Sequence, residues 1–169
     1  MSNLTQSEEA ALIKAARPEL SGQEFRNVIY QGAEFEEYKI AKDGLLMSYK
    51  FAHLEKYKEG RPLEWGAVGG KGVKYPSVNL MLPADMLSYV DKNNKQYSPS
   101  TSTVRRSIKI HILVADAWLG IDECPTELKP YWPSMPVELK IILIKYFQVD
   151  HIDDNKHNPH VSNLRFVPP

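Results

Sequence analysis

The chain of 169 residues has little of what marks several classes of protein. Its one cysteine, Cys124, excludes a disulfide framework and any zinc site built from several cysteines. No apolar run approaches the roughly 18 residues of a membrane-spanning helix, and the N-terminus lacks the cationic, apolar start of a signal peptide. We therefore expect a cytoplasmic or otherwise intracellular protein with no membrane partner.

Net charge is absent too, but the charges are spread unevenly. Residues 39–115 carry a net charge of +7, whereas residues 1–38 carry −4 and residues 116–169 carry −3. A basic centre between acidic ends favours a polyanion as the partner of one surface. An ordinary solvated, lysine-rich surface would have the same charge distribution, so charge alone leaves both interpretations open.

Apolar residues at 43% and aromatic residues at 10% are enough for a packed core, in one domain or two small ones. Local patterns in the first part of the chain predict an amphipathic helix, then strands and turns. The predicted elements are a helix over 4–17, a hairpin of 38–41 and 45–49 around the turn Lys42-Asp43-Gly44, a loop over 53–64, a glycine-rich turn over 66–72, a strand over 76–82 and a turn over 91–95.

A helical pattern follows from Ser107. The apolar positions 110, 113, 114, 117 and 118 repeat at helical spacing, and Gly120 can end the helix. Residues 121–136 contain four prolines and predict a long loop. The next segment, 137–146, fits either a short helix or a strand, and 147–150 predicts a strand.

Beyond that strand the chain has the residue types that phosphodiester hydrolysis needs. Asp150 and His151 end the apolar run, the polar residues 153–155 form a turn, and Asn163 begins a return strand. Histidine is the natural base near neutral pH, and aspartate is a hard oxygen ligand suited to Mg²⁺ or Mn²⁺. The Asn163 amide can hydrogen-bond across the turn and fix its shape.

The stretch Val-Asp-His-Ile-Asp-Asp-Asn-Lys-His-Asn over 149–158, with Asn-Leu-Arg-Phe-Val over 163–167, resembles the HNH endonucleases, above all the phage and intron-borne homing members. Residues 110–120 resemble the family's His-Arg-Leu-Val-Ala helix. Residues 38–48 resemble the small N-terminal module of such proteins, a NUMOD4-like module. The three matches stand in the family's order, which makes the resemblance more specific than one motif would.

The resemblance implies two strands and a helix around one metal ion, a ββα-metal fold. It implies His151 as general base, Asp150 as ligand of one divalent cation (Mg²⁺ or Mn²⁺) and Asn163 as the central, loop-fixing residue. The family's last metal ligand lies on a helix after the second strand, and the given sequence, which ends at Pro169, has no match for that ligand. Three interpretations stay open: a fragment of a longer protein, a ligand supplied by a partner subunit or homodimer, or a degenerate member.

We therefore expect an α+β protein in three parts. These are an N-terminal helical arm (1–24), a strand-rich DNA-contacting module (25–100), and an HNH domain (101–169) that lacks its last helix. The expected partner is double-stranded DNA, and the residues expected to meet its phosphates are Lys71, Lys74, Arg105, Arg106 and Lys109. Two functions remain: a metal-dependent DNA endonuclease, and an HNH-derived DNA- or protein-binding module without nuclease activity.

The other histidines and the three tryptophans are expected to have structural rather than catalytic or DNA-binding roles. The position of His111 beside an apolar helical face predicts a packed or capping residue. We expect His53, His157 and His160 to be exposed loop residues. The alternative for His157 and His160 is recruitment as the missing metal ligand. The three tryptophans, Trp65, Trp118 and Trp132, predict core or loop-anchoring side chains.

Overall fold

The computed structural model describes residues 23–50, 60–68, 74–86 and 103–169. The predicted helix over 4–17, the turn over 91–95, His53 and Lys71 lie outside these residues. The described residues form nine strands and two α-helices with short 3₁₀ turns, so the predicted α+β class is confirmed at that level. None of the helices in the described part of the chain is long and apolar enough to cross a membrane.

The first sheet has four antiparallel strands in chain order. They are β1 (Phe25–Tyr30), β2 (Ala33–Ala41), β3 (Leu46–Ser48) and β4 (Arg61–Pro62). The predicted hairpin is present, because β2 pairs with β3 around the turn at Gly44, whose φ of +89° suits glycine. The strand β4 falls inside the segment predicted as a loop, where its two residues pair with Met47 and Ser48.

The second sheet joins β5 (Gly66–Val68), β6 (Tyr75–Pro83) and β7 (Thr103–Lys109), again antiparallel. The strand over 76–82 is confirmed, whereas β5 occupies the start of the predicted glycine-rich turn. The sequence pattern missed β7, in which exposed and part-buried residues alternate and the full length pairs with β6. This pairing joins chain segments on either side of the expected boundary at residue 100.

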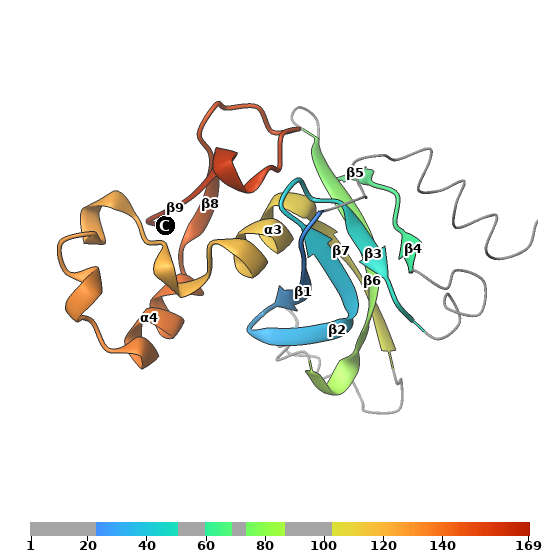
Figure 1. The fold of residues 1–169 in the computed structure, drawn as a ribbon, viewed down its shortest axis with the longest axis horizontal. Helices are drawn as coiled ribbons and strands as arrows, with labels where there is room; N and C mark the ends of the chain where they lie inside the picture. The colour runs from blue at the N-terminus through green and yellow to red at the C-terminus, as the bar shows by residue number, and fades with distance from the viewer. Residues whose placement is uncertain (1–22, 51–59, 69–73, 87–102) are drawn as a thin grey trace, which may run out of the picture.

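The helix α3 (Ile110–Trp118) follows β7 directly and lies at the centre of the molecule, between the two sheets and the C-terminal hairpin (Figure 1). Its buried face includes Ile110, Leu113, Val114 and Ala117, so the predicted helical face is confirmed. The helix starts at Ile110 because the preceding residues belong to the sheet. Gly120, with φ of +59°, follows the helix end.

The proline-rich loop contains three 3₁₀ turns, at Gly120–Asp122, Thr126–Leu128 and Trp132–Ser134. The ambiguous segment after it is a helix, α4 (Val137–Ile144), which has no buried residue and exposes Leu139, Ile141 and Ile142. Two of the tryptophans anchor as predicted. Trp118 Nε1 donates to the Ile40 carbonyl at 3.2 Å, and Trp132 Nε1 donates to the Ile121 carbonyl at 2.8 Å. Trp65 is 41% exposed.

The C-terminal hairpin consists of β8 (Gln148–His151) and β9 (Leu164–Val167), joined by the loop 152–163 that includes a 3₁₀ turn at Val161–Asn163. One hydrophobic core joins both sheets, α3 and the hairpin, with Val28, Leu80, Leu113 and Phe166 among its members. The backbone of the first hairpin also meets the loop, since Val161 N–H donates to the Lys42 carbonyl at 2.8 Å. The C-terminal hairpin is therefore packed against the rest of the molecule and shares its hydrophobic core.

Candidate active site

The loop between β8 and β9 is closed by the side chain of Asn163. Its Oδ1 accepts a hydrogen bond from the Asp153 backbone N–H at 3.0 Å, and its Nδ2 donates to the Asn158 carbonyl at 2.9 Å. Asn163 is 7% exposed, so these bonds are shielded from water. The amide thus makes the loop-fixing contacts that the sequence predicted.

The carboxylate of Asp153 adds a second brace to the same loop. Its oxygens accept from the Asn155 backbone N–H at 2.8 Å and from Asn158 Nδ2 at 3.1 Å. These hydrogen bonds, that of Asn158 first, hold the pKa of Asp153 below its usual range. Pro159, which stands where the family usually has a second asparagine, is buried beside Gly44.

His160 caps the 3₁₀ turn, and its Nδ1 lies 2.8 Å from Ser162 Oγ, whereas His157 is exposed. Both histidines lie in the loop as predicted, but His160 is half-buried rather than exposed.

Asp150 is held by two cations. It lies directly opposite Arg165 in the β8–β9 ladder, and its Oδ2 accepts from Arg165 Nε at 3.0 Å and Nη2 at 2.7 Å. Lys156 Nζ lies 3.9 Å from the other oxygen, Oδ1. The Arg165 hydrogen bonds, opposed by desolvation, keep the pKa of Asp150 below its ordinary value.

His151 lies in a different environment from its neighbour, because successive residues of a strand point to opposite faces. Its side chain is 1% exposed, and its ring lies edge-on to that of His111, with centroids 4.7 Å apart. Within the described residues, His151 Nε2 is buried with no hydrogen-bond partner. Burial first, and then the charge of Lys156, lowers the pKa of His151, so the imidazole is neutral at neutral pH.

Two further aromatic and basic groups surround the histidine pair. The Tyr75 ring lies 5.2 Å from that of His111 and 6.3 Å from that of His151, and Lys109 Nζ sits 4.2 Å above the Tyr75 ring. His111 is 5% exposed, and burial, followed by the charge of His151, lowers its pKa to about 4. The cluster combines residues of β6, β7, α3 and β8.

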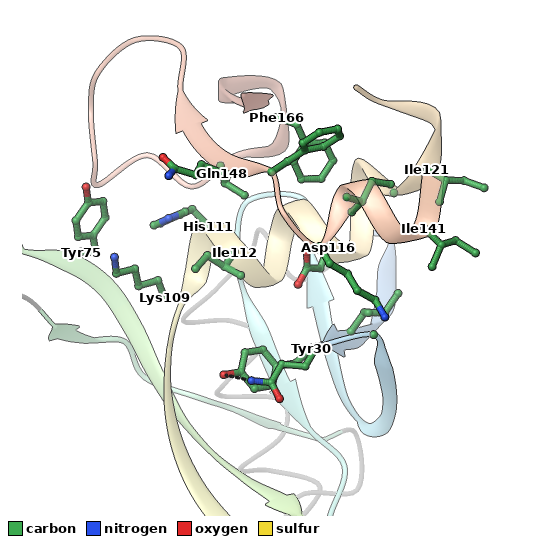
Figure 2. A pocket seen from close by; sticks show the side chains of 18 residues that line it. Tyr30, Tyr75, Lys109, His111, Ile112, Asp116, Ile121, Ile141, Gln148 and Phe166 are labelled. Carbon is green, nitrogen blue, oxygen red and sulfur yellow. Dashed lines mark hydrogen bonds between the residues drawn. The ribbon is translucent and has the colours of Figure 1, made fainter. Parts of the chain in front are cut away.

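A cavity of about 820 Å³ adjoins this cluster, between α3, α4, the β1–β2 turn and β8. Figure 2 shows Tyr75, Lys109, His111 and Gln148 together at the end of the cavity where α3 begins. Asp116 lines the cavity further along the helix, and burial raises the pKa of its carboxyl to about 7. The rest of the lining is mainly apolar, with Ile112, Ile144 and Phe166 among its members.

The basic residues expected to meet DNA are not all in one place. Arg105 is exposed and Arg106 part-buried on β7, Lys109 lies at the histidine cluster, and Lys74 is exposed just before β6. The sequence placed the two arginines before a helix, and the structure places them in a strand whose successive side chains point to opposite faces.

The oxygens nearest the candidate base do not form a metal centre as they are arranged. The carboxylate of Asp150 is paired with Arg165, and the oxygens of Asp153 and Asn163 are committed to the loop. No group of three or more His, Cys, Asp or Glu side chains in the described parts of the chain could hold a metal ion. The residues present thus do not fit the implied cation in this arrangement.

Two residues of the site were missed in the sequence: Arg165 was noted only as part of the family pattern, and Tyr75 was not singled out. The interpretation of His111 as a packed residue is confirmed, since its side chain is 5% exposed, but its contact with His151 was not foreseen. The cross-strand position of Arg165 opposite Asp150 could have been found from the expected hairpin register. The meeting of His111 with His151 depends on how α3 packs on the hairpin, for which the sequence has no local signal.

No family model matches the chain, and no curated protein matches it. Among solved structures, the chain is similar to one described as "DNA binding and cleavage by the HNH homing endonuclease I-HmuI", with 21% identity and a TM-score of 0.42. The match covers 86% of this chain and 52% of that one, so the chain spans about half the length of that protein.

Proposed function

We propose that the chain is an HNH-type endonuclease that hydrolyses phosphodiester bonds in double-stranded DNA. One observation supports this most: the Asp-His pair ends a strand whose return partner starts directly after Asn163, and Asn163 closes the loop between them with two hydrogen bonds. This is the arrangement that the resemblance to HNH endonucleases implies for the base, the acidic residue and the central asparagine.

In this proposal His151 is the general base. A neutral imidazole has one unprotonated ring nitrogen, which can accept a proton from the attacking water. Asn163 acts by holding the loop in shape, and Asp150 is the acidic residue of the pair. The cations Lys109, Lys156 and Arg165 surround the site and would attract the phosphate.

The remaining expectations are part of the same proposal. Residues 25–100, with a NUMOD4-like module, contact DNA, and residues 101–169 hydrolyse it. The residues that contact the DNA phosphates are Lys71, Lys74, Arg105, Arg106 and Lys109. The resemblance also implies one divalent cation, Mg²⁺ or Mn²⁺, with Asp150 among its ligands. A partner subunit or homodimer that supplies a further ligand is one of the three interpretations that the sequence leaves open. The protein acts in the cytoplasm, as a phage-encoded or other intracellular enzyme.

The test is cleavage of supercoiled plasmid DNA by the purified chain, with Mg²⁺, Mn²⁺ or a chelator. We expect cutting by the wild type and a loss of about 100-fold or more in His151→Ala, because general-base catalysis contributes about 10² to 10⁴ in rate. Binding of a fluorescent 30-base-pair duplex should be unchanged, since the histidine acts on water. The matched control is His157→Ala, in an exposed histidine of the same loop.

Two results would contradict the proposal. Undiminished cutting by His151→Ala would show that another group, or a contaminating nuclease, does the chemistry. Binding of the duplex with no cutting by the wild type under any of the three conditions would instead favour the binding module without nuclease activity.

A further inference from the structure

A histidine that serves as general base must present one ring nitrogen in a fixed direction, and among the described residues Nε2 of His151 has no hydrogen-bond partner that would set this direction. The torsion that turns an imidazole about its Cβ–Cγ bond has broad minima, so the side-chain rotamer alone does not fix the ring plane. Many catalytic and metal-binding histidines are oriented by a hydrogen bond to the second ring nitrogen. For His151 the contacts that the structure gives are ring contacts, to His111 and to Tyr75.

We propose that His111 is a positioning residue for His151: its buried ring, edge-on to the imidazole of His151, fixes the plane in which the base meets the attacking water. The inference rests on the proposed function, in which His151 is the base. It assigns a task to a residue that the sequence marks only as part of a helix.

The surroundings of His111 suit this task. Its backbone is in the first turn of α3, directly after β7, so its position is fixed by both a helix and a sheet. The interplanar angle of 68° with His151 is the edge-to-face geometry that aromatic pairs prefer. The Tyr75 ring also packs against His111, with centroids 5.2 Å apart, and is itself covered by the Lys109 ammonium. The lowered pKa of His111 keeps the ring uncharged, so it adds no like charge beside the base.

The decisive comparison is between two substitutions that both fill the site. His111→Phe keeps a planar ring in contact with His151, and His111→Leu keeps the volume without the plane. Single-turnover cutting of supercoiled plasmid DNA should slow by about 10- to 100-fold in His111→Leu, the usual effect of losing an orienting partner. His111→Phe should cut within a few-fold of the wild type, and both variants should bind duplex DNA like the wild type. The matched control, Val114→Ala, is another buried position of α3 and should cut at the wild-type rate per folded molecule.

A second readout does not depend on cutting. In protein labelled with ¹³C at histidine Cε1, the resonance of His151, assigned by its loss in His151→Gln, should be broadened and shifted toward the free-histidine position in His111→Leu and nearly unchanged in His111→Phe. An unchanged His151 resonance in His111→Leu, or equal cutting rates for the Leu and Phe variants, would overturn the positioning role. If the wild type does not cut at all, the proposed function fails, and the resonance still decides whether His111 orients His151.

Discussion

Replacing Asn163 by alanine should destabilise the protein more than any other single change in the β8–β9 loop. The substitution removes both hydrogen bonds that the amide makes, at 3.0 and 2.9 Å, from a side chain that is 7% exposed. Their partners are the backbone N–H of Asp153, near the start of the loop, and the backbone carbonyl of Asn158, in its middle. Both would lose a protein partner at once, and the loop would lose the side-chain contacts that join its end to these two points.

The magnitude follows from these two bonds. A hydrogen bond contributes a net of about 1 kcal/mol, and a shielded partner left without one costs about 1 to 3 kcal/mol. We expect Asn163→Ala to lower the free energy of unfolding by about 2 to 4 kcal/mol, since the loop can relax and let water reach part of the freed backbone. In a chain of this size, each kcal/mol shifts the melting temperature by about 2 to 4 °C.

Urea denaturation followed by circular dichroism measures this change. The matched control is Asn155→Ala, an exposed asparagine of the same loop whose Oδ1 accepts only the His157 N–H, at 3.1 Å. It should cost under about 0.5 kcal/mol. Asn163→Asp keeps the acceptor and loses the donor, so it should lie between the two. If Asn163→Ala is no less stable than Asn155→Ala, the buried amide is not what holds the loop.

Three further predictions concern the pKa values and the turns. The pKa of Asp116 in the folded state, about 7, is above that of a free aspartate. Between about pH 4 and 7 the folded state therefore keeps a proton on this carboxyl that the unfolded state has lost. The free energy of unfolding falls as pH rises through this range. Asp116→Asn should therefore stabilise the protein at pH 8.5, by about 1 to 3 kcal/mol, and not at pH 4.5; equal melting shifts at both would contradict this. In urea denaturation, Gly44→Ala should lower the free energy of unfolding by about 2 to 4 kcal/mol, since φ is +89° and a Cβ would lie 2.5 Å from an α3 side chain. Gly120→Ala should lower it by about 1 kcal/mol, because φ is +59° but a Cβ there would meet no other atom. Arg165→Leu should raise the pKa of Asp150 toward its ordinary value, measured by the pH titration of its carboxyl ¹³C resonance; an unmoved pKa would show that the guanidinium does not hold that carboxylate.

Elements with a strong local pattern could be predicted from the sequence. The Asp43-Gly44 turn, the apolar stripe of α3 and the strand leading to Asp150 each combine a period with a turn or cap residue, and each is present. The strand β7 was missed because two adjacent arginines interrupt the apolar alternation, and its pairing with β6 compensates for that weak pattern. For α4, an almost wholly apolar run fits either a helix or a strand, and the local pattern does not decide between them.

Only those residues of the candidate site that are close together in the sequence could be predicted. Asp150, His151 and Asn163 are within one hairpin, so their proximity follows from a single register. The ring of His111 and the Lys109 ammonium come to the same place from the end of β7 and the start of α3, through a core that joins segments far apart in sequence. Such contacts depend on how helices and sheets pack, which residue patterns do not encode locally.

The contact between the β2–β3 turn and the C-terminal loop has a consequence for local opening. Gly44 packs against the side chains of Ile110 and Pro159, and the Val161 amide is bonded to the Lys42 carbonyl. The loop beside the base can therefore fluctuate open only by breaking contacts with the first sheet. In hydrogen exchange, the Val161 amide should be protected to the same extent as amides of β2 and β3, as members of one cooperative unit. The first hairpin, distant in sequence from the histidines, would then set how often the loop beside them opens.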